Sequence, residues 1–270
     1  STDIFVNRYP EDGGDNEGPH YWAAAAGHLI QYLSLLSSAT GNDMKWSANQ
    51  LLRKTGDYIY GVHIDQDHFF NYGDSYPREI YDPSVVLEYG KFEGIAPKAP
   101  QPIESWFPDL QLITLRTNEG SPKGLFLGAK AGANYDTQHN HNDVGSFVVY
   151  VDGLPALIDI GVGTYTINTF SKDRYSIWTF QSQWHNSPTI NGIEQECGPQ
   201  YAAQYAKYTK LENGGQFEAD IAGAYPTEAQ VKSWSEDSKI EDSWGKHINR
   251  VSLVPKKESL EGQFTVTFHL

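Results

Sequence analysis

Histidine and aspartate side chains gather in the second half of the chain. His139 and His141 lie in the run HNHND, and Asp159 and His185 follow farther along. If this run is extended, alternate residues point to the same face, so both imidazoles can reach one site. Two histidines and one aspartate are a common zinc ligand set that leaves a fourth position open. The pattern therefore indicates a metal site.

Other interpretations of the histidine pair remain open at this point. An HxH pair on a strand is often a polar rim that binds nothing. A zinc-activated water in a metallohydrolase is another possibility. Val144 stands where metallo-β-lactamase-like hydrolases have a further histidine, and the glutamate that cupin-like barrels place a few residues on is missing. These departures speak against a hydrolytic site.

Helical patterns dominate the first part of the chain. Between Pro19 and Gly41 the apolar residues recur at a helical period, which predicts a helix that starts near the proline and stops at the glycine. A second helix is predicted over Ser47–Ile59 and a short one over Pro83–Tyr89. The proline-rich segment Pro97–Pro108 has the composition of a linker or domain boundary.

Beyond this segment the hydrophobic pattern changes to a period of two, which predicts strands. Turn residues such as Asp152-Gly153 separate them. The predicted strands are Leu110–Arg116, Leu125–Ala131, Ser146–Asp152, Pro155–Ile160, Gln216–Ile221 and Gln263–Leu270. Strands that follow one another without helices favour an antiparallel sandwich over a doubly wound sheet.

Composition limits the classes of function. The chain has 270 residues and a net charge of −14, which argues against nucleic-acid binding. Its single cysteine, Cys197, excludes an internal disulfide and a cysteine-rich zinc site. No run of about 18 apolar residues occurs, so no membrane-spanning helix is expected. The chain begins at Ser1 and ends in a predicted strand, so we expect it to be a piece of a longer protein.

Four segments together resemble the heparinase II/III-like proteins, a family of polysaccharide lyases that includes heparin or heparan lyases and alginate lyases. The run HNHNDVGSFVVYVDGLPALIDIGVGTYT looks like the family signature, and WHNSPTINGIEQ resembles a later family segment. DGGDNEGPHYW resembles the family's helix entry, and NYGDS its FGDS segment. The four segments occur in family order, but they do not single out a substrate.

The resemblance implies an α+β fold, in which the C-terminal part of an α/α toroid is followed by an antiparallel β-sandwich. Residues 1–108 are expected to form the helical region, as a partial toroid. Residues 109–270 are expected to form the β-sandwich. This division agrees with the pattern of helices first and strands after.

The resemblance also implies β-elimination, in which a base removes the C5 proton of a uronate and an acid protonates the leaving glycosidic oxygen. Tyr21 matches the family's tyrosine, so we expect it to be the acid and a candidate for the base. His139 matches the histidine that faces the substrate, as a neutralising group or base. His141, Asp159 and His185 match residues that hold zinc in several members, where the metal looks structural.

Two more residues are expected near the substrate. Glu17 either accepts a sugar hydroxyl or stabilises the start of the helix, and the helix role is favoured. Arg174 lies where family members often have an arginine before the zinc histidine, so we expect it to pair with a uronate carboxylate.

The resemblance further implies an anionic polysaccharide or oligosaccharide partner and a periplasmic or secreted bacterial protein. The acidic balance favours a less sulfated uronate polymer, such as an alginate-like glycan. Active members also use an Asn or His on an earlier toroid helix to neutralise the carboxylate, and the sequence offers no counterpart. A non-catalytic carbohydrate-binding or structural member of the same fold is therefore the alternative. The polymer, endo or exo action and the oligomeric state stay open.

Overall fold

The computed structural model describes residues 2–41, 49–79, 101–135, 139–190, 192–212, 214–227 and 251–253. The predicted helix Pro83–Tyr89 and strand Gln263–Leu270 lie outside these residues. The helices come first: α1 (Thr2–Val6), α2 (Pro19–Trp22), a π-helical turn (Ala23–Gly27), α3 (His28–Thr40) and α4 (Gln50–Val62). A hairpin of β1 (His63–Asp65) and β2 (His68–Phe69) follows α4.

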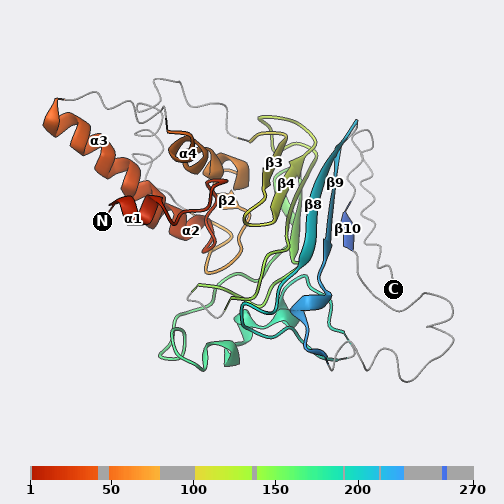
Figure 1. The fold of residues 1–270 in the computed structure, drawn as a ribbon. Helices are drawn as coiled ribbons and strands as arrows, with labels where there is room; N and C mark the ends of the chain where they lie inside the picture. The colour runs from red at the N-terminus through yellow and green to blue at the C-terminus, as the bar shows by residue number, and fades with distance from the viewer. Residues whose placement is uncertain are drawn as a thin grey trace.

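The remaining strands form two antiparallel sheets, which confirms the predicted α+β class (Figure 1). One sheet contains β3 (Glu104–Phe107), β4 (Leu112–Arg116), β5 (Leu125–Lys130), β6 (Phe147–Val151) and β7 (Leu154–Leu157), paired in chain order. The other contains β8 (Gln204–Leu211), β9 (Gly214–Asp220) and β10 (Val251–Leu253), with β9 in the middle.

The larger sheet is the middle layer of the fold. On β4, Leu112 packs into a core shared with the helices, whereas its neighbour Ile113 packs into a core shared with β9. On β5, Phe126 packs into the core shared with the helices and Leu127 into the core shared with β9. Because successive side chains of a strand point to opposite faces, one strand supplies both cores. The helices therefore cover one face of this sheet and the second sheet covers the other, as Figure 1 shows.

The turn between β6 and β7 follows the sequence signal. Asp152 and Gly153 have φ angles of 52° and 78°. Positive φ at both central residues is the geometry of a type I′ hairpin turn, which favours Asp-Gly. The predicted turn is confirmed.

The first long helix differs from the prediction in one respect. It starts at Pro19 and ends before Gly41, whose φ is 61°, as expected. A π-helical turn over Ala23–Gly27 interrupts it. Such a turn inserts an extra residue and is frequent at functional sites. It changes the rotation of the preceding residues, including Tyr21, relative to α3.

Five of the described strands were not predicted: β1, β2, β3, β8 and β10. β3 lies within the segment predicted to be a linker, between Pro102 and Pro108. It is the edge strand of its sheet, where a nearby proline does not break a ladder hydrogen bond. This strand also lies before the predicted division of the chain at residue 108, which stays a prediction. β8 was missed because its exposed face mixes Lys, Gln and Tyr. None of the described helices has the length and hydropathy of a membrane span.

Candidate functional site

The carboxylate of Asp74 is the centre of a hydrogen-bonded group at the junction of helices and sheet. Its Oδ2 atom accepts hydrogen bonds from His139 Nδ1 at 2.9 Å and from the Tyr165 hydroxyl at 2.8 Å. Its Oδ1 atom accepts from His141 Nε2 at 2.8 Å and from Arg174 Nη2 at 2.6 Å. We call these residues, together with Tyr21, the Asp74 cluster.

Asp74 stays ionised in this setting. Burial alone would raise the pKa of its carboxyl group, but the hydrogen bonds from His139 and His141 and the charge of Arg174 outweigh burial. They hold the pKa well below its usual range. An ionised carboxylate only accepts hydrogen bonds, so His139 must donate through Nδ1. Its Nε2 atom is then free to accept a proton whenever the imidazole is neutral.

Tyr21 lies directly beside His139. The centroids of the two rings are 3.8 Å apart, and the Tyr21 and Tyr165 hydroxyl oxygens are 2.8 Å apart. The adjoining Trp22 is buried, and its indole donates to the Thr55 carbonyl at 2.8 Å, which anchors α2 on α4. Burial raises the pKa of Tyr21, while the hydrogen bond with Tyr165 acts to lower it. Tyr21 and His139 thus form an adjacent phenol and imidazole pair.

His139 and His141 do converge, but not as alternate residues of a strand. They lie in the loop before β6, and His139 has a φ of 71°, an uncommon backbone conformation for a residue other than glycine. The backbone nitrogen of Asp74 donates to the His139 carbonyl at 3.1 Å. A Cβ atom at Gly73 would lie 2.9 Å from the same carbonyl oxygen, so only glycine permits this approach. The run is therefore not extended, and Asp74 with its loop brings the two rings together.

A second buried carboxylate, Asp159, organises the other predicted residues. Its Oδ2 atom accepts from His185 Nδ1 at 2.8 Å and from the Ser146 hydroxyl at 2.9 Å. The His185 and His141 ring centroids are 5.2 Å apart. Burial would raise the pKa of Asp159, but the charge and hydrogen bond of His185 lower it to about 2. We call Asp159, His185 and Ser146 the Asp159 cluster.

These contacts allow a test of whether His141, Asp159 and His185 suit zinc. No described group of three His, Cys, Asp or Glu side chains is arranged as a preformed metal site. Two buried ring nitrogens, His141 Nδ1 and His185 Nε2, nevertheless have no hydrogen-bond partner among the described residues. Each ring donates its other nitrogen to a carboxylate, as metal-ligating histidines generally do. Two imidazoles and a carboxylate are a donor set that zinc accepts. In this arrangement Asp159 accepts from His185 Nδ1, so its carboxylate would have to turn to reach an ion bound at His185 Nε2.

Arg174 occupies a different position from the expected one. Its side chain is buried, stacks on Phe180 at 3.9 Å, and donates to Asp74 and to the backbone carbonyls of Asn140 and Thr169. With its donors engaged inside the protein, the guanidinium supports Asp74 and does not face an open surface for a uronate.

Glu17 borders a cavity at the surface of the helical region. The cavity is a groove of about 460 Å³ between α1 and the loop before α2. Its lining includes Phe5, Arg8, Tyr9, Asp15, Glu17 and Ala25. Gly18, and not Glu17, occupies the N-cap position of α2. The lining includes none of the residues of the Asp74 cluster, and Glu17 is the lining residue whose charge interacts with His139 and Asp74.

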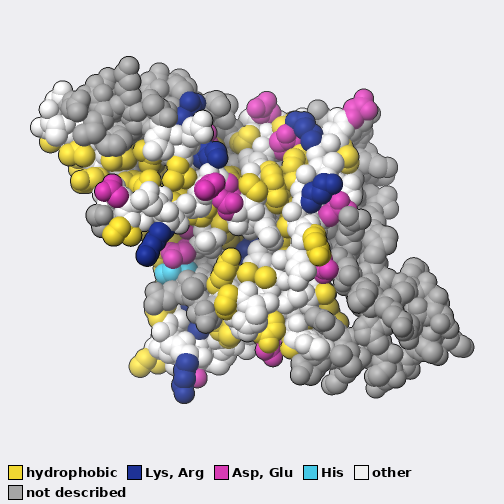
Figure 2. Space-filling model, in the orientation of Figure 1, with side chains coloured by type: hydrophobic (Ala, Val, Ile, Leu, Met, Phe, Trp, Pro, Cys, Tyr) yellow, Lys and Arg dark blue, Asp and Glu magenta, His cyan; other side chains and the backbone are white. Residues whose placement is uncertain are grey.

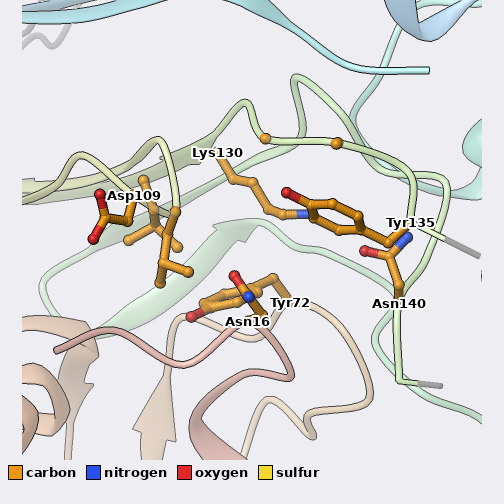
Figure 3. A pocket seen from close by; sticks show the side chains of 10 residues that line it. Asn16, Tyr72, Asp109, Lys130, Tyr135 and Asn140 are labelled. Atoms are coloured by element: carbon orange, nitrogen blue, oxygen red, sulfur yellow. The ribbon is translucent and has the colours of Figure 1, made fainter. Parts of the chain in front are cut away.

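A much smaller cavity lies beside Lys130, the last residue of β5, where Lys130 and Tyr135 extend from one side and Tyr72 and Asn16 from the other (Figure 3). Its volume is about 20 Å³, which is enough for about one water molecule. Lys130 forms an ion pair with the buried Asp143 beside it. A sugar cannot enter this space, whereas the groove beside Glu17 has room for one.

Two residues of the Asp74 cluster were overlooked at the sequence level. Asp74 lies in NYGDS and Tyr165 in GVGTYT, both within segments that carry the family resemblance. Neither lies near His139 in the sequence, and a lone Asp or Tyr has no spacing signal. On the face in Figure 2, Lys and Arg side chains are scattered among Asp and Glu, and form no continuous basic surface.

Comparisons with known proteins agree with this architecture. Residues 101–237 match the family model described as heparinase II/III-like, C-terminal, which is half of the 270-residue chain. No curated protein matches the sequence. The fold is similar to that of heparan sulfate lyase HepC from Pedobacter heparinus, with a TM-score of 0.65 and 16% identity. It is also similar to a heparinase III (0.60, 18%) and to the heparinase III BT4657 gene product with methylated lysines (0.66, 17%).

The alignments cover 82% to 83% of this chain and 36% to 38% of those structures. The chain therefore spans little more than a third of the length of these proteins. At such low identity the likeness concerns the fold.

Proposed function

The chain belongs to the heparinase II/III-like, C-terminal family, and on that premise we propose that it is part of a polysaccharide lyase. The proposed reaction is β-elimination in a uronic-acid-containing glycan. The observation that carries the proposal is the contact between Tyr21 and His139, whose ring centroids are 3.8 Å apart above an ionised Asp74.

The chemistry needs a base and an acid near one sugar. The C5 proton becomes acidic only when the developing negative charge beside the uronate carboxylate is stabilised. The base removes this proton, the C4–O bond breaks, and the electron pair forms the C4–C5 double bond. The departing oxygen then needs a proton from the acid.

We assign the base to His139 and the acid to Tyr21. The hydrogen bond from His139 Nδ1 to Asp74 leaves Nε2 as the atom that can take the C5 proton. The Tyr21 hydroxyl carries a proton that it can give to the glycosidic oxygen. Asp74 orients His139 and stabilises its protonated form, as a carboxylate does for a catalytic histidine.

The groove beside Glu17 is the proposed substrate site. Its volume of about 460 Å³ suits a short length of sugar chain. Arg8 is the basic residue in its lining and Asp15 and Glu17 are acidic, so a densely sulfated polymer would meet repulsion there. This arrangement supports a uronate polymer with few or no sulfates.

Zinc is proposed as a structural ion held by His141, Asp159 and His185. When bound there, the metal would tie the HNHND loop to the segment that carries His185. The metal is not assigned a part in the proton transfers, because the acid and the base are not among its ligands. Tyr21 is hydrogen-bonded to Tyr165, and His139 is hydrogen-bonded to Asp74.

The test is a lyase assay on the full-length protein that contains this chain. Heparan sulfate, its unsulfated precursor, alginate and hyaluronan are each incubated with the protein, and the absorbance of the unsaturated uronate is followed. We expect growth of this absorbance with at least one polymer. Tyr21→Phe should slow it by about 10²- to 10⁴-fold. Tyr205→Phe, at an exposed residue of β8, is the matched control and should leave the rate unchanged.

Absence of the unsaturated product with every polymer would contradict the proposal. Binding of one of these polymers without turnover would instead favour the non-catalytic carbohydrate-binding alternative.

A further inference from the structure

The Tyr165 hydroxyl lies between Tyr21 and Asp74. It is 2.8 Å from the Tyr21 hydroxyl and 2.8 Å from Asp74 Oδ2. The ring is held edge-on against Phe170, which packs in the same way against His139. Tyr165 is 40% exposed, so the residue lies at the surface and is not buried in the core. The reaction assigned above gives this residue no task.

Counting protons sets the direction of these hydrogen bonds. Tyr165 has one hydroxyl proton, and it donates this proton to Asp74 Oδ2. While Tyr165 donates that proton to Asp74, Tyr21 must donate to Tyr165. The Tyr21 proton then points to the Tyr165 hydroxyl oxygen.

The count changes once Tyr21 has given its proton away. The Tyr21 phenolate can only accept, and Tyr165 is the one neighbour hydroxyl shown within hydrogen-bond distance of it in the described part of the chain. Rotation about the Tyr165 C–O bond moves its proton from Asp74 to Tyr21 without breaking a covalent bond. Asp74 still accepts from His139, His141 and Arg174 after this rotation. The change therefore leaves no buried charge without a partner.

We propose that Tyr165 is a positioning residue, whose hydroxyl directs the Tyr21 proton in the resting state and donates to the Tyr21 phenolate after proton transfer. This inference rests on the proposed function, because it assumes that Tyr21 is the acid. In the balanced step, the Tyr21 proton moves to the glycosidic oxygen and the C5 proton moves to His139. The electron pair of the C5–H bond forms the double bond, and Tyr165 keeps its own proton throughout.

The surroundings of Tyr21 determine what an ionisation measurement would report. The titratable groups that face Tyr21 are Glu17, His20, Asp74, Tyr76, His139 and Tyr165. Asp74 and Glu17 disfavour a phenolate by their negative charge, whereas Tyr165 is the group that donates to it. Removing the Tyr165 hydroxyl should therefore make Tyr21 harder to ionise.

The experiment reads the ionisation of Tyr21 directly and needs no turnover. The chain is prepared with 3,5-difluorotyrosine in place of Tyr21, and its fluorine NMR signal is titrated with pH. The more acidic fluorinated phenol keeps the titration within a range in which the protein stays folded. The same titration is repeated with Tyr165→Phe and with the exposed control Tyr205→Phe, and circular dichroism checks that each variant is folded.

We expect Tyr165→Phe to move the titration midpoint upward by about one pH unit, because a hydrogen bond to a charged oxygen is lost. Tyr205→Phe should leave it unchanged. A midpoint that stays the same or moves downward in Tyr165→Phe overturns the inference, even if the wild-type protein is an active lyase. An upward shift in a protein without lyase activity supports the hydrogen-bond arrangement and overturns the proposed function instead.

Discussion

The Asp74 and Asp159 clusters use the same pair of side chains in two different surroundings. Each has a buried aspartate that accepts a hydrogen bond from histidine. In the Asp159 cluster the histidine is fully enclosed, since the His185 side chain has 0% exposure. In the Asp74 cluster, His139 retains 13% exposure beside the partly exposed Tyr165. An Asp–His pair can exchange a proton with a substrate only where one ring edge stays accessible, so these two clusters suit different tasks.

The number of charges also differs between the clusters. Asp74 binds a guanidinium and two imidazoles, whereas Asp159 binds one imidazole, a hydroxyl and the Gly161 backbone nitrogen. Asp74 is thus the only described carboxylate on which a buried arginine depends. Loss of its charge should cost more than loss of the Asp159 charge.

The largest effect is expected from Asp74→Asn. This change leaves the buried Arg174 without its counter-charge, and removing one partner of a buried ion pair costs about 3–5 kcal/mol. Chemical denaturation followed by tryptophan fluorescence would measure the loss. Asp152→Asn is the matched control, because a type I′ turn accepts asparagine equally well. Similar stabilities for the two variants would show that the charge of Asp74 does not support Arg174.

Binding of zinc at the Asp159 cluster and His141 should stabilise the folded protein. An ion that binds only the folded state stabilises it by about 2.7 kcal/mol when present at about 100 times its dissociation constant. We therefore expect zinc to raise the melting temperature of the wild type and a chelator to reverse the effect. His185→Gln should abolish the response, whereas His28→Gln, at an exposed histidine, should retain it. A melting temperature that zinc does not change in the wild type would rule out this site.

Asp15 provides a third buried carboxylate, and among the described residues it has no basic partner within ion-pair distance. Burial raises its pKa to about 6, although a hydrogen bond from the Glu17 backbone acts in the opposite direction. The folded state therefore binds a proton that the unfolded chain, with a pKa of about 3.9, releases. Between about pH 4 and 6, stability falls as pH rises, and the full cost is present above pH 6.

Asp15→Asn should remove that cost and stabilise the chain by about 2 kcal/mol at pH 7.5, with little change at pH 4. Denaturant midpoints at the two pH values measure the difference. Equal gains at both values would mean that ionisation of Asp15 is not the cause.

The smallest effect on stability is expected from Tyr165→Phe. Tyr165 is partly exposed, so removing its hydroxyl should lower the free energy of unfolding by no more than about 1 kcal/mol. A loss as large as that of Asp74→Asn would mean that Tyr165 holds the Asp74 cluster together, and the contrast between an open and a closed cluster would fail.

Much of the fold could be predicted because its signals are local. The period of two in Leu112–Arg116 and Leu125–Lys130 follows from strands whose faces alternate. The Asp152-Gly153 turn and the Gly41 helix end follow from backbone conformations that few residues adopt. The edge strand Glu104–Phe107 was not predicted. Its four residues show only a weak strand pattern, and the prolines on both sides indicate a loop.

The candidate site was only partly accessible from the sequence. His139, His141, Asp159 and His185 could be selected because they carry recognisable chemistry and a family resemblance. Asp74 and Tyr165 could not, because their role depends on distances across the fold. Arg174 was assigned to the substrate for the same reason, since burial is not visible in the sequence.

The amino-acid sequence by itself determined the order of helices and strands, the tight turns and the residue types that could do chemistry, because all of these depend on neighbours within a few positions. The tertiary structure alone decided which carboxylate each histidine contacts and which ring edge stays open. Asp74 and His139 are 65 positions apart in the chain, and Asp74 and Arg174 are 100 apart. Only the packing of helices on the middle sheet brings such distant side chains within hydrogen-bond distance.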